Sequence, residues 1–417
     1  MVRSTLARAP FCAPRLFLLA VLLLASPPIS AQFSGSDRAL ERSRMMAEVA
    51  KRQLDRAGGE VDLDTVGIEL VDPETMRDDL VRQNHQMFRD GHFDRIAAFL
   101  WALGLVILPE AELVISDFVQ SSQQTLGAYY QADRDAFVFI QAFNPAIGEL
   151  VLHELVHAGQ DQRGEFDRLF SGDRRTFDRS LAALTLLEGE AECVVLTAYY
   201  GEDNLRALRE EELDPYRGLN FDHPTSQLYL DGRRFMARRF KEAGWEGMRE
   251  ALANPPPSTE QVLHPSKYRL DEATEVSGAR LPLPVLGEDT IGESRIRHFI
   301  RLLGATPAES FIAAAGWDGD RVVIHEGAEG RPIVTWTSVW DRIEDAEQFA
   351  AALREHGPGR VAQRGRAVCW HNAKGGFVAR ILRGTLLDPG EPNAEDARTT
   401  AEIEAAWREK NPEPAED

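Results

Sequence analysis

The segment His153-Glu154-Leu155-Val156-His157 is an H-E-x-x-H pattern inside an apolar stretch, which predicts a metal-binding helix. Histidines at positions i and i+4 of a helix project from one face, so both rings can bind the same ion. Neighbouring positions are apolar, so we expect a buried helix over residues 147–162. Burying two imidazoles and a carboxylate without partners would be costly, and a bound metal ion would remove that cost. The alternative is a helix with two surface histidines and a chance glutamate.

A third ligand is expected from a second helix, predicted over residues 174–200, which contains Leu187-Glu188-Gly189-Glu190-Ala191-Glu192. A catalytic zinc site uses three protein ligands and leaves the fourth position to water. If the loop over residues 164–173 joins the two helices as an antiparallel pair, Glu188 returns to the two histidines. The alternative is that these acids form a solvated helix face.

The neighbours of Glu188 receive different expected roles. Glu192 lies one turn further on the same face. We expect it to hydrogen-bond the outer ring nitrogen of a ligand histidine and so fix the tautomer of that ring. Glu190 points elsewhere and is not expected to be a ligand. Gly189 lowers helix stability, which favours close approach of another helix near the metal.

These motifs resemble those of the gluzincin metallopeptidases, the group that contains thermolysin and the zinc aminopeptidases. In that group two histidines and a downstream glutamate bind zinc, and the glutamate of the motif is the catalytic base. The resemblance therefore implies one Zn²⁺ ion held by His153, His157 and Glu188, with Glu154 as the base.

A narrower resemblance is to an exported bacterial family whose members carry a helix reading HELxHALQDQ and a second helix reading EGxA. Residues 153–162 read HELVHAGQDQ, and the segments 127–140 and 258–265 are also similar to that family. Gly159 replaces the usual Leu, and Ala128-Tyr129-Tyr130 departs from the usual Phe-Tyr-Asp. Neither change affects an expected ligand, and the resemblance covers about residues 127–268.

The implied reaction needs a base and a donor for the developing negative charge. Glu154 would accept a proton from a zinc-activated water and pass it to the leaving amine. His264 is the first candidate for the oxyanion donor, because it lies in the family-like segment. Tyr229 and Tyr268 are alternatives, and a purely structural hydrogen bond is an equally open role for His264.

A hairpin is expected just before the zinc helix, from strands over residues 126–130 and 136–140 around an Asp-containing turn. Its residues Gly127, Ala128 and Tyr129 would form a sheet edge above the metal, to which a peptide substrate could add by main-chain pairing. The alternative is an internal strand without a free edge.

Residues 1–31 are laid out as a secretory signal peptide. Three arginines precede an apolar run over residues 16–25, and two prolines and small residues follow it up to Ala31. The run is short for a bilayer span, which takes about 20 residues; an uncleaved membrane anchor is the alternative. We expect an exported protein, periplasmic or extracellular, without a transmembrane span once the signal is removed.

The chain has 417 residues, of which 43% are hydrophobic and 27% are charged, a composition typical of globular proteins. Its formal net charge of -20 argues against nucleic-acid binding. Cys12 would leave with the signal, so Cys193 and Cys369 remain. An oxidising compartment would permit their pairing, but we favour two unpaired, buried cysteines.

The expected fold class is α+β, beginning with a gluzincin-like catalytic domain over residues 32–276 that is mostly helical with a small antiparallel sheet. A smaller α+β module of unknown role over residues 277–384 and a disordered acidic tail over residues 385–417 follow, with a linker at residues 281–284. Further helices are expected over residues 34–59, from Pro73 after an Asp72 cap, and over residues 93–103, 227–243, 246–253, 293–303 and 344–355. Further strands are expected over residues 66–71, 105–108, 113–115, 321–325 and 333–338.

The expected function is that of an exported zinc-dependent metallopeptidase acting on a peptide or protein substrate. One alternative is a non-catalytic exported scaffold that retains a degenerate zinc site. The other is a metal hydrolase that acts on a non-peptide amide.

Overall fold

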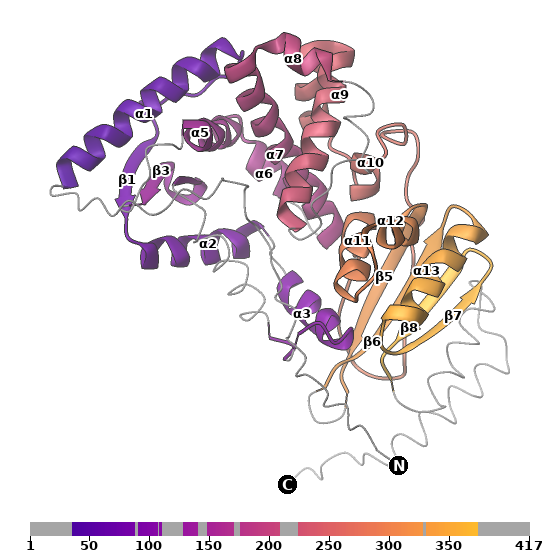
Figure 1. The fold of residues 1–417 in the computed structure, drawn as a ribbon. Helices are drawn as coiled ribbons and strands as arrows, with labels where there is room; N and C mark the ends of the chain where they lie inside the picture. The colour runs from indigo at the N-terminus through magenta and orange to yellow at the C-terminus, as the bar shows by residue number, and fades with distance from the viewer. Residues whose placement is uncertain are drawn as a thin grey trace, which may run out of the picture.

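The computed structural model describes residues 36–373, apart from residues 88–90, 107, 111–127, 141–147, 171–175, 209–223 and 328–330. Over this part of the chain the fold is mixed α+β, as expected, with a helical part next to a sheet-containing part (Figure 1). The expected signal peptide, the acidic tail, the strand over residues 113–115 and Gly127 lie outside the described residues. Among the described residues, no helix is long and apolar enough to cross a membrane.

The first sheet contains β1 (Gly67–Val71), β2 (Ala128–Gln131) and β3 (Ala136–Ile140) in the order β1-β3-β2. The expected hairpin is confirmed, because β2 and β3 pair antiparallel around the short turn Ala132–Arg134. The expectation of a purely antiparallel sheet is wrong, because β1 pairs with β3 in parallel. Parallel pairing needs a long crossover, and two helices lie between these strands in the sequence.

Those two helices are α2 (Pro73–Met87) and α3 (His92–Ala102). The cap expected for α2 is confirmed, because the Thr75 backbone N–H donates to Asp72 Oδ1 at 2.8 Å. The strand expected over residues 105–108 is wrong, since its described residues form no strand. Instead the backbone N–H groups of Gly104 and Leu105 donate back to carbonyls of α3, with Gly104 at a φ of 73°. This closes the helix with a left-handed glycine.

Four longer helices surround the first sheet or pack beside it: α1 (Ser36–Arg56), α5 (Gly148–Gln162), α7 (Phe177–Tyr200) and α9 (Pro224–Ala253). Helix α7 begins after Thr176, whose side chain accepts from the Arg179 backbone N–H, and ends at Gly201. The two helices expected over residues 227–253 are confirmed as the two segments of α9, which meet at the non-helical Ala243 and Gly244. The short helix α6 (Glu165–Phe170) lies between α5 and α7 in the sequence, α8 (Glu202–Ala207) lies between α7 and α9, and α10 (Thr259–Leu263) follows α9.

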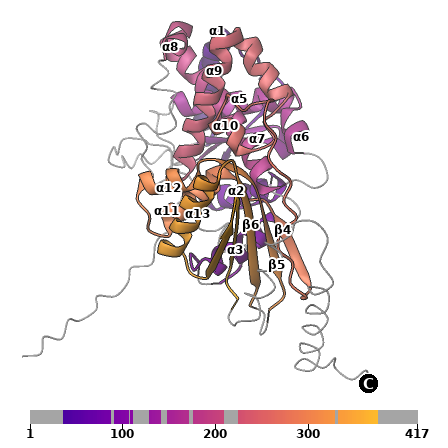
Figure 2. The ribbon, with the colours of Figure 1, turned by 90° about the vertical axis from the view of Figure 1, so that its right-hand side faces the viewer.

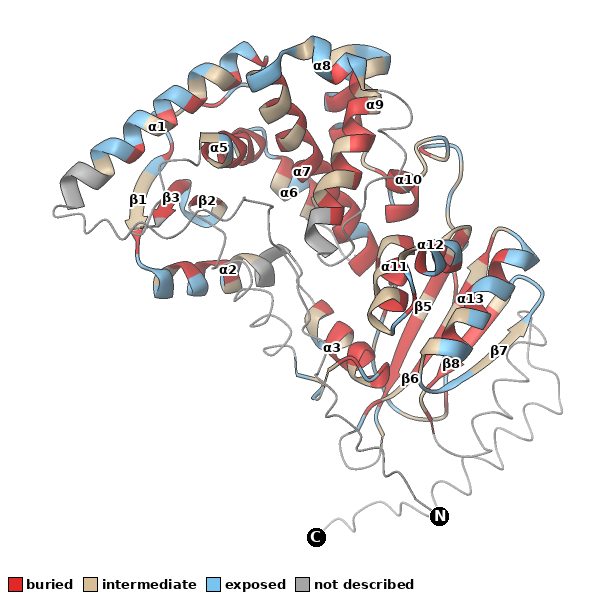
Figure 3. Ribbon diagram, in the orientation of Figure 1, coloured by how far each residue is buried: buried red, intermediate tan, exposed pale blue. Residues whose placement is uncertain are grey.

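Burial differs sharply among these helices, as Figure 3 shows. Helix α1 is exposed along one face, whereas α5 and α7 are buried over most of their length. Val151, Leu152, Leu155 and Val156 of α5 pack into one apolar core with α1 and the first sheet. The apolar positions around the two histidines therefore produce the buried helix that the sequence predicts.

Helices α7 and α9 approach closely at a pair of glycines. A Cβ atom added to Gly189 would lie 2.4 Å from the backbone carbonyl carbon of Gly232, and one added to Gly232 would lie 2.0 Å from the Thr185 carbonyl oxygen. Both contacts are with backbone atoms, which cannot rotate away. The close helix contact expected from Gly189 is confirmed, and it lies directly beside Glu188.

We expect Gly189→Ala to destabilise the protein by about 1–3 kcal/mol, the usual cost of overpacking. The gain in helix propensity, about 1 kcal/mol, offsets only part of that cost. Urea unfolding measures the difference. Gly148→Ala is the control, because its added methyl would meet only the hydroxyl of Tyr199, a half-exposed side chain that can move. Equal stability of Gly189→Ala and the wild type would contradict this account of the contact.

The second sheet contains β4 (Val285–Asp289), β5 (Trp317–His325), β6 (Ile333–Trp340), β8 (Ala367–His371) and β7 (Arg360–Arg364), in that order and antiparallel throughout. Helices α11 (Glu293–Leu302), α12 (Pro307–Ala314) and α13 (Ile343–His356) share one apolar core with it. Figure 2 shows these helices to one side of the sheet. The helices and strands expected here are confirmed with small shifts of their ends, whereas β4, β7, β8 and α12 were not expected.

Helix α3 belongs to this second core, although it comes from the N-terminal half of the sequence. The Phe99 ring makes edge contacts with Phe299, Trp336 and Trp370, at centroid distances of 5.5, 5.0 and 6.3 Å. The segment expected to be a linker also packs onto the sheet, because the Leu281 backbone N–H donates to His325 Nε2 at 3.0 Å.

Buried polar contacts join the second sheet to the helical part. Asp289 of β4 accepts from the backbone N–H of Phe177, the first residue of α7, at 2.7 Å, and also binds His92 and Arg95 of α3. Arg297 of α11 forms a buried ion pair with Asp231 of α9, 2.7 Å long. The two helices that meet at the glycine contact are therefore both held from the second sheet's side.

Cys193 and Cys369 are both free and buried, so the expectation of two unpaired cysteines is confirmed. Cys193 is on α7 and Cys369 is on β8. Burial raises the pKa of the Cys193 thiol, which disfavours its reactive thiolate form.

Candidate metal centre

The structure brings His153, His157 and Glu188 together between α5 and α7. Glu188 Oε2 lies 2.9 Å from His153 Nε2 and 3.5 Å from His157 Nε2. One ligand atom from each of the three residues lies within 4.8 Å of the others. All three residues are at most 9% exposed. The antiparallel return that the sequence predicts therefore places the carboxylate against both imidazoles.

This donor set fits a metal ion. The carboxylate oxygen lies 2.9 and 3.5 Å from the two histidine nitrogens, and all three ligand atoms lie within 4.8 Å of one another, which is compatible with ligands that surround one small cation at about 2 Å. The rings are also oriented suitably, because both Nε2 atoms face the same carboxylate oxygen. The cluster by itself does not distinguish zinc from other divalent metals.

Each histidine has a polar neighbour at its other ring nitrogen. His153 Nδ1 lies 3.6 Å from Glu192 Oε1, which is the position expected for Glu192. His157 Nδ1 lies 2.8 Å from Gln160 Oε1, a contact that sequence reasoning missed. The one signal for it in the sequence is that Gln160 falls within the family-like HELxHALQDQ segment. Glu190 turns away from the cluster and binds Gln160 and Arg163, as expected for a residue that is not a ligand.

Glu154 lies beside the cluster and is held by the first sheet. Its Oε2 accepts from the backbone N–H of Tyr130 at 3.1 Å, and the residue is 8% exposed. The Tyr130 hydroxyl also donates to Asp161 at the other end of α5, at 2.7 Å. Strand β2 therefore holds α5 at two points, and one of them orients the carboxylate of Glu154.

Burial and charge act in opposite directions on these acids. Burial raises the pKa of Glu154 above its ordinary value, although both imidazoles oppose the shift. Burial alone would also raise the pKa of Glu188, but His157 and His153 outweigh it and hold that pKa well below its ordinary range. Two carboxyl groups in one site thus receive different properties: Glu188 stays ionised, and Glu154 is a stronger base than an exposed glutamate.

Of the three expected oxyanion donors, Tyr229 is the one that lies at the cluster. Its ring centroid is 5.5 Å from that of His153. Burial, with Glu188 as a nearby charge and hydrogen-bond partner, raises the pKa of its hydroxyl well above the ordinary value. The hydroxyl therefore stays protonated and able to donate.

His264 and Tyr268 lie elsewhere, so their expected roles at the metal are not supported. His264 Nε2 lies 2.8 Å from Glu293 Oε1 of α11. The Tyr268 hydroxyl donates to the Asn254 carbonyl at 2.6 Å, and its ring packs on Phe235. Within the described residues neither side chain contacts the three candidate ligands. The structural hydrogen bond that was the open alternative for His264 is the arrangement found.

The expected substrate edge is only partly available. Strand β2 is at one end of the order β1-β3-β2, and alternate residues of a strand direct their backbone groups to the same side. On the side away from β3, the Tyr130 N–H is bonded to Glu154 and the Tyr130 carbonyl to Gln83. Tyr129 is buried and its hydroxyl donates to Asp79. Gly127 lies outside the described residues. Ala128, two positions before Tyr130, directs its backbone N–H and carbonyl to the same outward side as Tyr130.

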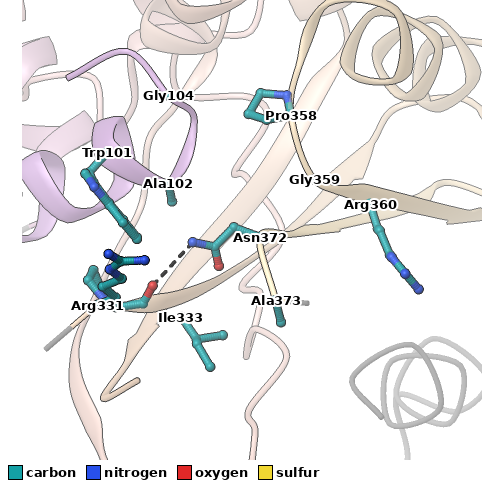
Figure 4. A pocket seen from close by; sticks show the side chains of 11 residues that line it. Trp101, Ala102, Gly104, Arg331, Ile333, Pro358, Gly359, Arg360, Asn372 and Ala373 are labelled. Carbon is teal, nitrogen blue, oxygen red and sulfur yellow. Dashed lines mark hydrogen bonds between the residues drawn. The ribbon is translucent and has the colours of Figure 1, made fainter. Parts of the chain in front are cut away.

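A separate cavity of about 610 Å³ lies where α3 ends against the second sheet. Figure 4 shows Trp101 and Ala102 on one side and Asn372 on the other, with the Asn372 side chain bonded to the Pro332 carbonyl at 3.3 Å. None of the residues named around this cavity belongs to the histidine and glutamate cluster, so the cavity is not part of the candidate metal centre.

Residues 282–384 match the model of a family described as a domain of unknown function (DUF8575). This match covers the second sheet and its helices and contains none of the candidate ligands. No curated protein and no solved structure matches the chain. The candidate metal centre is therefore supported by the contacts among His153, His157 and Glu188 and by the motifs that contain them.

Proposed function

We propose that this protein is an exported zinc-dependent metallopeptidase with a gluzincin-like site. The observation that carries the proposal is the convergence of His153, His157 and Glu188 beside Glu154. We assign zinc because an H-E-x-x-H helix with a downstream glutamate is the ligand pattern of catalytic zinc sites such as that of thermolysin. Export is inferred from the signal-like layout of residues 1–31.

When bound, zinc would act as a Lewis acid toward a substrate carbonyl and lower the pKa of a water molecule toward about 7. His153, His157 and Glu188 would hold it. Glu154 is the residue that would take a proton from water and return it to the leaving amine. Its burial supports that role, since a raised pKa makes it a better acceptor near neutral pH.

Tyr229 is the residue we assign to the developing oxyanion, in place of His264. Its hydroxyl is a protonated donor beside the cluster, and such a donor stabilises negative charge that forms in the transition state. It comes from α9, whose glycine contact with α7 sets its distance from Glu188.

The three-ligand arrangement favours a catalytic over a structural metal. Structural zinc sites usually close with four protein ligands, and cysteine is prominent among them. Cys193 is on the same helix as Glu188, but its thiol is directed at the Arg233 carbonyl of α9. The intact Glu154 beside the cluster also favours catalysis, because a non-catalytic scaffold needs no base next to its metal ligands. A hydrolase acting on a non-peptide amide would use the same residues. Only the substrate that is cleaved distinguishes such an enzyme from a peptidase.

Metal binding is the first test. We expect the purified wild type to bind one zinc ion, and Glu188→Ala to weaken binding by at least tenfold because it removes a ligand. Isothermal titration measures both. Glu149→Ala is the control for the same change, at an exposed carboxylate in the first turn of α5. Equal zinc affinity in the wild type and Glu188→Ala would refute the assigned ligand set.

The second test is a cleavage profile of a proteome-derived peptide library, read by mass spectrometry. Cleavage by the zinc-loaded protein supports a peptidase. Zinc binding with no cleaved peptide would overturn the peptidase proposal and favour the scaffold, or a hydrolase of non-peptide amides that a cell-wall substrate would reveal.

A further inference from the structure

We propose that Gln160 is a positioning residue that fixes the tautomer and ring orientation of His157, and thereby sets the metal affinity of the site. This inference rests on the proposed metal centre. It assigns a role to a residue that would bind neither the metal nor the substrate.

Gln160 is fully buried between α5 and α7, and its side-chain amide makes three hydrogen bonds. The oxygen lies 2.8 Å from His157 Nδ1. The nitrogen donates to the Leu187 carbonyl at 2.9 Å and to Glu190 Oε2 at 2.8 Å. The partners belong to both ligand-bearing helices: His157 is on α5, whereas Leu187 and Glu190 flank Glu188 on α7.

The chemistry of these partners fixes which way the amide faces. A backbone carbonyl can only accept a hydrogen bond, and so can a carboxylate. The amide nitrogen must therefore face Leu187 and Glu190, which leaves the amide oxygen facing His157. An oxygen acceptor at Nδ1 requires that Nδ1 carry the hydrogen. The lone pair of the ring then lies on Nε2, the atom that faces Glu188.

The outer end of this chain of contacts is anchored by charge. Glu190 is 7% exposed and pairs with Arg163 NH2 at 2.8 Å, and Arg163 also pairs with Glu165 at 3.1 Å. Arg163 follows directly after α5, and Glu190 is on α7. Their ion pair therefore joins the same two helices that Gln160 joins. The contacts run from Arg163 through Glu190 and Gln160 to His157, and every described step is within hydrogen-bonding distance.

Among the described residues, no partner lies as close to the outer nitrogen of the other histidine, His153. Glu192 lies 3.6 Å from His153 Nδ1, beyond a good hydrogen bond, and its side chain is 31% exposed. Of the two rings, His157 is therefore the one that is held through its outer nitrogen, Nδ1. Mutation of a partner of this kind typically weakens metal binding about 10-fold to 100-fold.

The test compares Gln160→Met with Gln162→Met. Methionine keeps the length of the side chain but removes the acceptor and both donors. Gln162 is two residues away on α5 and also makes three hydrogen bonds, to Asp62 and Thr65 on the loop after α1. Both changes thus remove the same chemistry from the same helix, but Gln162 contacts no candidate ligand.

We expect Gln160→Met to weaken zinc binding about 10-fold to 100-fold and Gln162→Met to leave it within about twofold of the wild type. Isothermal titration measures affinity, and urea unfolding of the metal-free proteins shows whether both variants are folded. In the cobalt-substituted protein, the exchangeable ring N–H signal of His157 should exchange with water faster in Gln160→Met than in the wild type or Gln162→Met. A residue that only supports the fold would not change that signal selectively.

A second experiment exchanges the amide of residue 160 and the carboxylate of residue 190, so the side-chain volumes stay the same. Gln160→Glu alone places two carboxylates against each other and should weaken zinc binding. Adding Glu190→Gln restores one acceptor toward His157 and one donor between positions 160 and 190, so the double variant should bind zinc more tightly than Gln160→Glu. Equal zinc affinity and equal N–H exchange in the wild type and Gln160→Met would overturn the inference. If the wild type binds no zinc, the proposed function fails, which is a different result.

Discussion

Glu154→Gln is expected to reduce peptide hydrolysis about 10²-fold to 10⁴-fold, the usual contribution of a general base, while zinc remains bound. The amide has the same shape as the carboxylate, and its oxygen can still accept from the Tyr130 backbone N–H. It cannot accept a proton near neutral pH. Turnover of a peptide identified in the library screen measures the effect, and isothermal titration measures the bound zinc.

Glu149→Gln is the matched control for this experiment. Glu149 lies in the first turn of the same helix and is exposed, so the same substitution there should leave turnover unchanged. Full activity in Glu154→Gln would show that another residue is the base. Loss of zinc together with activity would show instead that Glu154 is a ligand, which contradicts the ligand set proposed here.

Arg297→Met is expected to destabilise the protein by about 3–5 kcal/mol, because it leaves a buried carboxylate without its closest cation. Both side chains of the Arg297–Asp231 pair are at most 5% exposed. Asp231 precedes Gly232, which packs against Gly189 beside Glu188. Urea unfolding measures stability, and we also expect weaker zinc binding because α9 loses its contact with α11.

The same substitution in an exposed pair controls for the loss of charge. Arg249 pairs with Glu246 at 2.8 Å, but their side chains are 55% and 74% exposed, so Arg249→Met should change stability by less than about 1 kcal/mol. Replacing both members of the buried pair, Arg297→Met with Asp231→Asn, removes the unpaired carboxylate and keeps an acceptor for Gln227, so it should recover part of the loss. A single variant as stable as the wild type would show that the buried pair does not hold α9.

The parts of the site that the sequence predicts depend on local spacing. His153 and His157 are one helical turn apart whatever the rest of the chain does, and Glu192 follows Glu188 by the same interval. The connection that brings Glu188 back was expected to be a loop over residues 164–173, but it contains the short helix α6. Gln160 lies three positions after His157 and so is also a helical neighbour of it, but its orientation is set by Leu187 and Glu190 on another helix. No local pattern contains that information.

The errors in the fold also come from contacts between distant parts of the chain. The parallel pairing of β1 depends on the path of α2 and α3, and the hydrophobic pattern of a short strand does not give its direction. Strand β4 is exposed at most positions, and β7 has an exposed arginine at each end with partly buried residues between them, so neither shows the alternation that identifies a half-buried strand. Tyr229 was separated from His264 by geometry alone, since both are ordinary donors in the sequence.

The position of α3 has a consequence for how this chain can be divided or inherited. A gene fragment ending before residue 282 would encode every candidate ligand, yet it would leave Phe99 facing water where Trp336 and Trp370 now cover it. A fragment beginning there would lack the helix that fills its own interior. The two halves are therefore not independent folding units. A protein that gains or loses the C-terminal unit must gain or lose the α3 segment with it.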